Sequence, residues 1–405
     1  MLGGFDNLKE AIVLDQEALS LCPPGHPLRS RSLSGLAIHL SSRYDLLGGI
    51  DYPNQAIVLD LEALSLCAPG HADRPWSLNN LAVRLCSRYE LLGGIDDPGE
   101  VIVLTQEALS LRPPGHPFGS SSLNNLANLL STRYNLLGGI DDVKEDIVLM
   151  REALSLRPPG HPLRSSSLNN LALHLSTKYD LLGGIDELKE AIVLDREALS
   201  LCPPGHPDRL LSLNNLALHL STRYNLLGGI DDLTEAVVLD REAFLLCPPG
   251  HPFRSSCLNN LAVRLATLHT LFGVFGDLNG AIVLTRGALS LRPPGQPDCS
   301  LSLNNLGRHL SIQYELLGGI DDLNAAIELD QEALLLCPPG HSDRSLSLSS
   351  LALHLAIRYK LLGRIDDLNE AIVLAWEAFS LCSPGHPRRS LSLHSLADHF
   401  FLRSA

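Results

Sequence analysis

The sequence predicts an all-helical solenoid built from nine tandem copies of a 45-residue helix–turn–helix unit. Two glycine motifs repeat with this period. The glycine of Leu-Leu-Gly-Gly-Ile-Asp-Asp, or of its degenerate form, falls at Gly3, Gly48, Gly93, Gly138, Gly183, Gly228, Gly273, Gly318 and Gly363. The glycine of Pro-Pro-Gly-His-Pro recurs at the same interval from Gly25 to Gly385. Because each unit of such an array contacts mainly its neighbours, we expect one repeat domain over 1–405 rather than several globular domains.

The joints between repeats are expected near the glycine of the first motif, at Gly48, Gly93, Gly138, Gly183, Gly228, Gly273, Gly318 and Gly363. The chain begins inside a turn and ends partway through a helix, without the polar caps that terminal repeats need. We therefore expect a fragment of a longer array, or termini covered by a partner, including end-to-end self-association through the uncovered ends.

The first helix of a unit is exemplified by residues 206–227. His206-Pro207 can open it, because proline at the first helical position loses no needed N–H group. Its apolar residues recur at helical spacing and form one stripe, which consists of Leu213, Leu216, Ala217, Leu220, Tyr224 and Leu227. Gly228-Gly229 supplies the residues that end a helix in the left-handed conformation.

The second helix follows the Gly-Gly turn directly. Asp231 or Asp232 is expected to cap its first turn, since a short carboxylate accepts unpaired N–H groups. A second apolar stripe then runs along Leu233, Ala236, Val237, Leu239, Ala243 and Leu246, and Pro248-Pro249-Gly250 stops the helix. Neither helix can bury its apolar face alone, so stacked units are expected to share one continuous core.

Composition and charge exclude several classes of protein. The formal net charge of −14 argues against nucleic acid as the main partner, because such proteins usually carry a basic face. No stretch reaches the 18 apolar residues or more of a membrane helix, so no membrane partner is expected. The first residues lack the basic and apolar regions of a signal peptide, and we expect a cytoplasmic protein.

The recurring cysteines and histidines do not predict disulfides, metal sites or catalysis. Six of the nine cysteines share one repeat position, and packed helices lie too far apart for these equivalents to pair, so reduced thiols are expected. The histidine of Pro-Gly-His-Pro recurs one helix pair apart, which favours a capping or corner-packing role over zinc binding. No single constellation or phosphate-binding loop points to an enzyme or to a cofactor.

The repeat resembles a known family. Tyr179, Gly183, Ala191, Ile192, Ala198, Leu199 and Pro203 match the spacing of the tetratricopeptide (TPR) signature. The segment Gly205–Ala217 resembles the longer TPR of kinesin light chains, and similar arrays occur in fungal proteins, some of them joined to CHAT peptidase-like or NTPase domains. The resemblance implies a right-handed α-solenoid whose first helices line a concave groove. A period near 45 also suits HEAT or armadillo repeats, which are the alternative fold.

Polar columns on the first helices are the candidate peptide-binding residues. They form a ladder of amides with His or Arg four residues on, namely Asn80, Asn125, Asn170, Asn215, Asn260, Asn305, Arg84, His174, His219, Arg264, His309 and His354. Asparagine suits an extended peptide because its amide both donates and accepts hydrogen bonds. In kinesin-light-chain-like repeats the equivalent asparagines are implicated in cargo binding. The alternative is that these asparagines bridge neighbouring helices and were copied with each duplication.

Three functions remain open at this point. The first is a protein- or peptide-binding scaffold that uses the concave groove. The second is the sensor arm of a larger CHAT peptidase-like or signalling NTPase protein. The third is a truncated duplication product without a dedicated partner.

Overall fold

The computed structural model describes residues 2–47, 51–92, 98–112, 116, 118–137, 139–273, 275–292, 299–339, 341, 343–382 and 388–404. These residues form eighteen α-helices, and no strand occurs among them. The expected joints at Gly48, Gly93 and Gly138 lie outside the described residues. No helix in the described part of the chain is long and apolar enough to cross a membrane.

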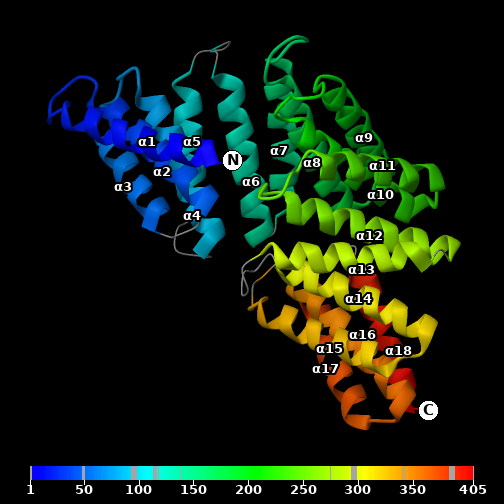
Figure 1. Ribbon diagram of the computed structural model, residues 1–405. Coiled ribbons are helices and arrows are strands. Elements are labelled where there is room, and N and C mark those ends of the chain that lie inside the picture. Colours follow the sequence, from blue (N-terminus) through cyan, green and yellow to red (C-terminus); the bar gives the residue numbers. More distant parts are fainter. Residues whose placement is uncertain are drawn as a thin grey trace. The chain divides into compact units, whose positions relative to one another are not determined.

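Helices of two types alternate along the chain (Figure 1). The first helix of each predicted unit, here called an A helix, is even-numbered: α2 (Arg29–Leu47), α4 (Arg74–Leu92), α6 (Gly119–Leu137), α8 (Arg164–Leu182), α10 (Arg209–Leu227), α12 (Arg254–Phe272), α14 (Cys299–Leu317), α16 (Arg344–Leu362) and α18 (Arg388–Ser404). The B helices are odd-numbered: α1 (Leu2–Ser20), α3 (Asp51–Ser65), α5 (Pro98–Ser110), α7 (Ile140–Ser155), α9 (Ile185–Ser200), α11 (Ile230–Leu245), α13 (Phe275–Ser290), α15 (Ile320–Leu335) and α17 (Ile365–Ser380).

The chain divides into two compact units. One comprises residues 1–178 and 193–203, and the other comprises residues 179–192 and 204–405. The packing within each unit repeats. In the first, α2, α4 and α6 each pack between the B helices that precede and follow them, and in the second α12, α14 and α16 do the same. Successive A helices also touch, as α4 and α6 do in the first unit and α16 and α18 do in the second.

The two predicted apolar stripes form the core of a repeat. Leu213, Leu216, Ala217 and Leu220 of α10 are buried, as are the small residues Ala236 and Ala243 of α11. The last residue of each stripe was wrongly placed in the core. Leu227 is 62% exposed and Leu246 is 38% exposed, because both lie where the helix ends and the chain turns away from its neighbours.

The Gly-Gly turn follows the prediction for its first glycine, but the expected aspartate cap is absent. Gly228 has φ 73° and ends α10 in the left-handed conformation. The N-cap residue of α11 is Gly229, and no side chain caps this helix. Asp232 lies in the first helical turn instead, where its carboxylate accepts two hydrogen bonds from Arg223 of α10, at 2.7 and 2.6 Å.

An arginine at the start of several A helices joins the two neighbouring B helices. Arg74 donates to the carbonyl of Cys67 beyond the end of α3 and to Glu107 Oε1 on α5, at 2.9 Å in both cases. We call this arrangement the arginine clamp. The same contact to a glutamate 33 residues on is made by Arg29, Arg164, Arg209 and Arg344. At the equivalent positions of two other repeats stand Gly119 and Cys299, and in a third repeat Gly287 stands where Arg254 would meet the glutamate.

The corner histidines make the helix-starting contact that the sequence predicts. His206 Nδ1 accepts a hydrogen bond from the backbone N–H of Asp208, at 3.1 Å. The equivalent contact, at 3.1–3.3 Å, is made by His26, His71, His116, His161, His251 and His341. His386 lies outside the described residues. Over the described ranges, no group of three or more His, Cys, Asp or Glu side chains is arranged to hold a metal ion.

Candidate functional site

The asparagine column lies between neighbouring A helices. Asn125 on α6 donates its Nδ2 hydrogen to Asn79 Oδ1 on α4, at 3.1 Å. Asn305 on α14 makes the same contact with Asn259 on α12, also at 3.1 Å. For these two residues the structure therefore shows the bridge between helices that the sequence left open as the alternative to peptide binding.

The other four asparagines of the column occupy the same helical position. Asn80 on α4 is buried, and its Nδ2 has no hydrogen-bond partner in the structure. Asn170, Asn215 and Asn260 are half-buried on α8, α10 and α12. A peptide contact at these four positions stays a prediction.

The His and Arg column points toward the preceding B helix. His174 Nδ1 lies 2.9 Å from Asp146 Oδ2 of α7, and its Nε2 lies 3.1 Å from Asn128 Oδ1 of α6. His354 Nδ1 lies 2.6 Å from Asp330 Oδ2 of α15. These side chains are buried and paired with a carboxylate, so they contribute to the joint between repeats, and a peptide contact at either histidine stays a prediction.

The remaining members of this column occupy similar surroundings. Arg264 Nε lies 3.4 Å from Asp240 Oδ2, and Arg84 Nε lies 3.9 Å from Asp60 Oδ2. His309 Nδ1 lies 3.3 Å from the hydroxyl of Thr285, which stands where other repeats carry the aspartate. His219 is buried on α10. The basic column was predicted from the sequence, but its aspartate partners were not. The spacing of 24 residues between Asp60 and Arg84, which recurs for Asp240 and Arg264, was the signal that could have identified them.

Burial dominates the electrostatics of these pairs. It raises the pKa of Asp60 to about 7 and that of Asp240 to about 6, while Arg84 and Arg264 respectively oppose the shift. Burial likewise raises the pKa of Asp146 and Asp330 against the opposing effect of His174 and His354. These groups lie in a low-dielectric interior, at the contact between an A helix and the B helix that precedes it.

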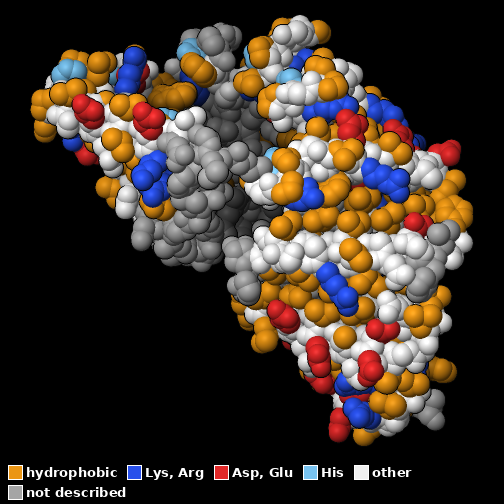
Figure 2. All heavy atoms as spheres, viewed as in Figure 1, with side chains coloured by type: hydrophobic (Ala, Val, Ile, Leu, Met, Phe, Trp, Pro, Cys, Tyr) orange, Lys and Arg blue, Asp and Glu red, His pale blue; other side chains and the backbone are white. Residues whose placement is uncertain are grey.

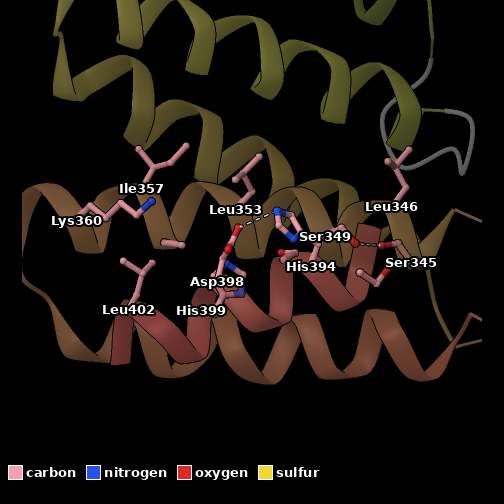
Figure 3. A pocket seen from close by; sticks show the side chains of 13 residues that line it. Ser345, Leu346, Ser349, Leu353, Ile357, Lys360, His394, Asp398, His399 and Leu402 are labelled. Carbon is pink, nitrogen blue, oxygen red and sulfur yellow. Dashed lines mark hydrogen bonds and ion pairs between the residues drawn. The ribbon is translucent and has the colours of Figure 1, made fainter. Parts of the chain in front are cut away.

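A cavity of about 410 Å³ lies between the A helices α16 and α18 (Figure 3). Its volume falls in the range of roughly 300–1,000 Å³ that is usual for ligand sites. Apolar side chains and serine hydroxyls dominate its lining, which comprises Ser345, Leu346, Ser349, Leu353, Ala356, Ile357, Lys360, Ser392, His394, Ser395, Asp398, His399 and Leu402.

This cavity lies at a junction where the asparagine bridge is missing. At the α4–α6 and α12–α14 junctions two amides span the gap between A helices, but here the corresponding bridge positions carry Ser349 on α16 and Ser395 on α18. Their short side chains cannot meet across the gap. Ile357 and Leu402 occupy positions that hold Ser or Thr in the first six repeats, so the space is lined by apolar groups. The last two positions of the asparagine column are Ser350 and Ser395, and the cavity was not predicted from the sequence.

Charged groups lie at the edges of the cavity. Lys360 is exposed on α16, at a position that holds Asp, Glu, Asn or Thr in the seven preceding repeats. On α18, His394 Nε2 lies 3.7 Å from Asp398 Oδ2, and both side chains are exposed. Figure 3 shows Lys360 and Asp398 on the two sides of the lining. A ligand would therefore meet an apolar surface with one ammonium group and one carboxylate beside it.

A buried histidine completes the lining. His399 is 3% exposed, and its Nδ1 has no hydrogen-bond partner in the structure. Ala375 occupies the position at which other repeats carry the partner aspartate. Burial lowers the pKa of His399, Asp398 opposes this shift, and Lys360 adds to it, so the surroundings favour the neutral ring.

The part of the surface seen in Figure 2 carries no patch of basic side chains among its described residues. On the described part of the face in Figure 2, Lys and Arg side chains lie singly among apolar and acidic ones. The net charge of the chain is −14. Most of the affinity for a phosphate backbone comes from electrostatic attraction to clustered basic side chains, which this described face does not show.

Comparison with known proteins establishes the fold. No family model and no curated protein matches the sequence. Human IFIT1, a TPR protein solved as a dimer with PPP-AAAA, matches with a TM-score of 0.59 and 13% identity over 98% of this chain and 78% of its own. A monomeric IFIT1 mutant with Gppp-AAAA matches with a TM-score of 0.60 and 14% identity, over 98% of this chain and 76% of its own.

A third solved structure is similar over part of the chain. It is a Podosopora anserina putative kinesin light chain with nearly identical TPR-like repeats, and it is 20% identical over 54% of this chain and 98% of its own. Its TM-score of 0.39 is too low to carry a structural argument. At these identities the likenesses show the fold alone, and they confirm the predicted array of TPR-type helix pairs.

Proposed function

We propose that this TPR-type repeat array is a peptide-binding scaffold, and that the cavity between α16 and α18 receives an apolar side chain of the bound peptide. The observation that carries the proposal is the replacement of the asparagine bridge by a lined cavity of about 410 Å³ on the A helices. Peptide-recognition grooves in general use an apolar pocket as the anchor and nearby polar groups to fix orientation.

The lining indicates the chemistry of the peptide. Leu346, Leu353 and Ile357 offer apolar contacts that suit a leucine, isoleucine, methionine or phenylalanine side chain. The hydroxyls of Ser392 and Ser395 can bond the peptide backbone, because a hydroxyl both donates and accepts. Lys360 favours an acidic residue of the peptide close to the apolar anchor.

A nucleic-acid partner is less compatible with these residues. Lys360 is the single Lys or Arg of the lining, and Asp398 faces the same space. The IFIT1 structures contain PPP-AAAA and Gppp-AAAA, but the similarity to this chain extends to the fold and not to any matched site. A triphosphate needs several converging cations or backbone N–H groups, which this cavity does not offer.

The experiment is a selection of nine-residue peptides displayed on phage against the purified chain, followed by calorimetry with the selected peptides. The test variant is Leu353→Asp, which puts a charge into the lining where the leucine side chain is 52% exposed. The matched control is Leu218→Asp, at the same repeat position of α10, where the leucine is 46% exposed and lies outside the cavity lining. Circular dichroism checks that both variants keep the helical content of the natural chain.

A second substitution tests the charge of the cavity edge. Lys360→Glu copies Glu315, which occupies the equivalent position one repeat earlier, so it is expected to preserve the helix. We expect selected peptides to carry an apolar residue near an acidic one. We expect Leu353→Asp to weaken their binding at least tenfold, Lys360→Glu to weaken it several-fold, and Leu218→Asp to leave it unchanged.

Three results would contradict the proposal. Equal loss of binding in Leu353→Asp and Leu218→Asp would place the contact elsewhere on the A helices. The absence of any selected peptide would favour a repeat array without a dedicated peptide partner. Tight binding of PPP-AAAA that Lys360→Glu abolishes would show that the site takes a phosphate ligand.

A further inference from the structure

Two cysteine sulfurs meet at one corner of the array. Cys247 follows the end of α11, and Cys257 lies in the first turn of α12. Their Sγ atoms are 3.4 Å apart, and both side chains are buried. Nine residues separate them along the chain, and they include the Pro-Pro-Gly-His-Pro corner that joins a B helix to the next A helix.

The same contact recurs elsewhere with a hydroxyl in place of the second sulfur. Cys67 Sγ lies 3.6 Å from Ser77 Oγ, and Cys337 Sγ lies 3.6 Å from Ser347 Oγ. Cys382 Sγ and Ser392 Oγ are 3.9 Å apart. The repeat geometry therefore brings these two positions together regardless of the residue types. The presence of Cys257 where other repeats carry serine creates a dithiol from this recurring contact.

We propose that Cys247 and Cys257 are an oxidation site, at which hydrogen peroxide or a small-molecule disulfide such as glutathione disulfide converts the two thiols to a disulfide bond. A disulfide has an S–S distance of about 2.05 Å, so the two sulfurs must approach by roughly 1.4 Å. Equivalent cysteines of successive repeats lie on packed helices that are too far apart to pair. This pair escapes that limit because its members occupy two different positions on either side of one corner.

The chemistry balances with either oxidant. With peroxide, one thiolate attacks an oxygen atom to give a sulfenic acid and water, and the second thiol displaces water from that sulfur as the S–S bond forms. The two thiols lose two electrons and two protons, and the peroxide is reduced to two waters. With glutathione disulfide, one thiolate forms a mixed disulfide and releases glutathione, and the second thiol releases the other glutathione.

Burial controls when the reaction can occur. Burial raises the pKa of Cys247, and it raises the pKa of Cys257 to about 12, with the neighbouring Cys247 adding to the shift. The thiolate is the reactive form, so the closed corner resists oxidation at neutral pH. Arg254 also holds this corner closed, because its Nη1 donates to the carbonyl of Cys247. Oxidation therefore depends on local opening of the segment between α11 and α12.

The test uses the full chain equilibrated in buffers of reduced and oxidised glutathione, at urea concentrations from zero to just below the unfolding transition. Remaining thiols are alkylated after acid quenching, and unreduced proteolytic digests are mapped by mass spectrometry. Cys86, which is half-buried, serves as an internal reference for a thiol without a neighbouring sulfur. We expect a cross-linked peptide that contains Cys247 and Cys257, to form faster as urea rises.

Two variants use the array's own residues as controls. Cys257→Ser restores the residue that other repeats carry at this position, and it should fold normally and give no cross-link. Ser347→Cys should create a second dithiol with Cys337 and a second cross-linked peptide. The proposal is overturned if Cys247 and Cys257 stay separately alkylated in every buffer, including those with urea. It is also overturned if either cysteine ends mainly as a glutathione adduct or pairs with another cysteine.

Discussion

The carboxylate of Asp146 binds the imidazole of His174 although it lies one helical turn from the place where other repeats carry their aspartate. The two residues are 28 positions apart, whereas Asp330 and His354 are 24 apart. The usual position in α7 holds Met150, which is buried. Residues four apart lie on the same face of a helix, so the carboxylate reaches the same imidazole from either place. Both repeats therefore contain an aspartate–histidine pair, although the aspartate occupies different positions in them.

This relationship predicts that a second substitution restores the stability lost through a first one. Asp146→Ala, which installs the residue found at this position in most repeats, should lower the free energy of unfolding by about 1–3 kcal/mol, because it removes a partner of the buried His174. Adding Met150→Asp restores the 24-residue spacing and should recover most of the loss. Urea unfolding followed by circular dichroism measures both. A double variant no more stable than the single one would show that the pair contributes nothing through its geometry.

The stability that a buried aspartate contributes should decrease as the pH rises. Burial raises the pKa of Asp60 to about 7, above its value near 3.8 in the unfolded chain. Its contribution to stability is therefore fully present below pH 3.8 and is lost as the pH rises through about 7. Replacing the pair with Asp60→Thr and Arg84→Leu copies Thr105 and Leu129 of the next repeat.

This double variant should lose less stability than the natural chain between pH 4 and pH 7. The slope attributable to one proton is up to about 1.4 kcal/mol per pH unit. Urea titrations at pH 4.5, 5.5 and 6.5 measure the difference. Parallel curves for the two proteins would mean that Asp60 does not change its pKa on folding.

For the buried His309, the predicted change of stability with pH has the opposite sign. Burial, with a further contribution from Arg308, lowers its pKa to about 4 from about 6.5 in the unfolded chain. The stability that it contributes is present above pH 6.5 and is lost as the pH falls through about 4. His309→Leu next to Thr285 again copies the Thr105 and Leu129 pair, and it should reduce the loss between pH 6.5 and pH 4. The urea midpoint of unfolding is measured for both proteins at pH 7 and pH 5. An equal fall of the midpoint in both proteins would contradict the lowered pKa of His309.

The helices were predictable because apolar periodicity and glycine turns act locally. The 45-residue period, the stripes of α10 and α11 and the left-handed Gly228 all follow from such signals. The orientation of the polar columns was not predictable from one repeat. Whether His354 faces solvent or the preceding helix depends on the rotation of α16 against α15, which packing between repeats decides.

The candidate site was less accessible to sequence reasoning for a different reason. A cavity is a volume left by several side chains on two helices, here including Ser349, Ile357, Ser395 and Leu402. Each substitution is visible in the sequence, but the space between helices exists only once both are packed. The end of the asparagine column at Ser350 and Ser395 was the one sequence signal that marked this junction as different.

The arginine clamp is present at some junctions between repeats and absent at others, so the junctions should differ in stability. Five clamps link successive B helices, but Gly119 and Cys299 replace the arginine in two repeats, and Gly287 replaces the glutamate in a third. The stability of a linear repeat protein is approximately a sum of unit energies and nearest-neighbour couplings. A pulling force or a denaturant should therefore separate the chain first at the three junctions without a complete clamp. Blocks of repeats would then detach as cooperative pieces, and their lengths would be set by where the arginine or its glutamate is missing.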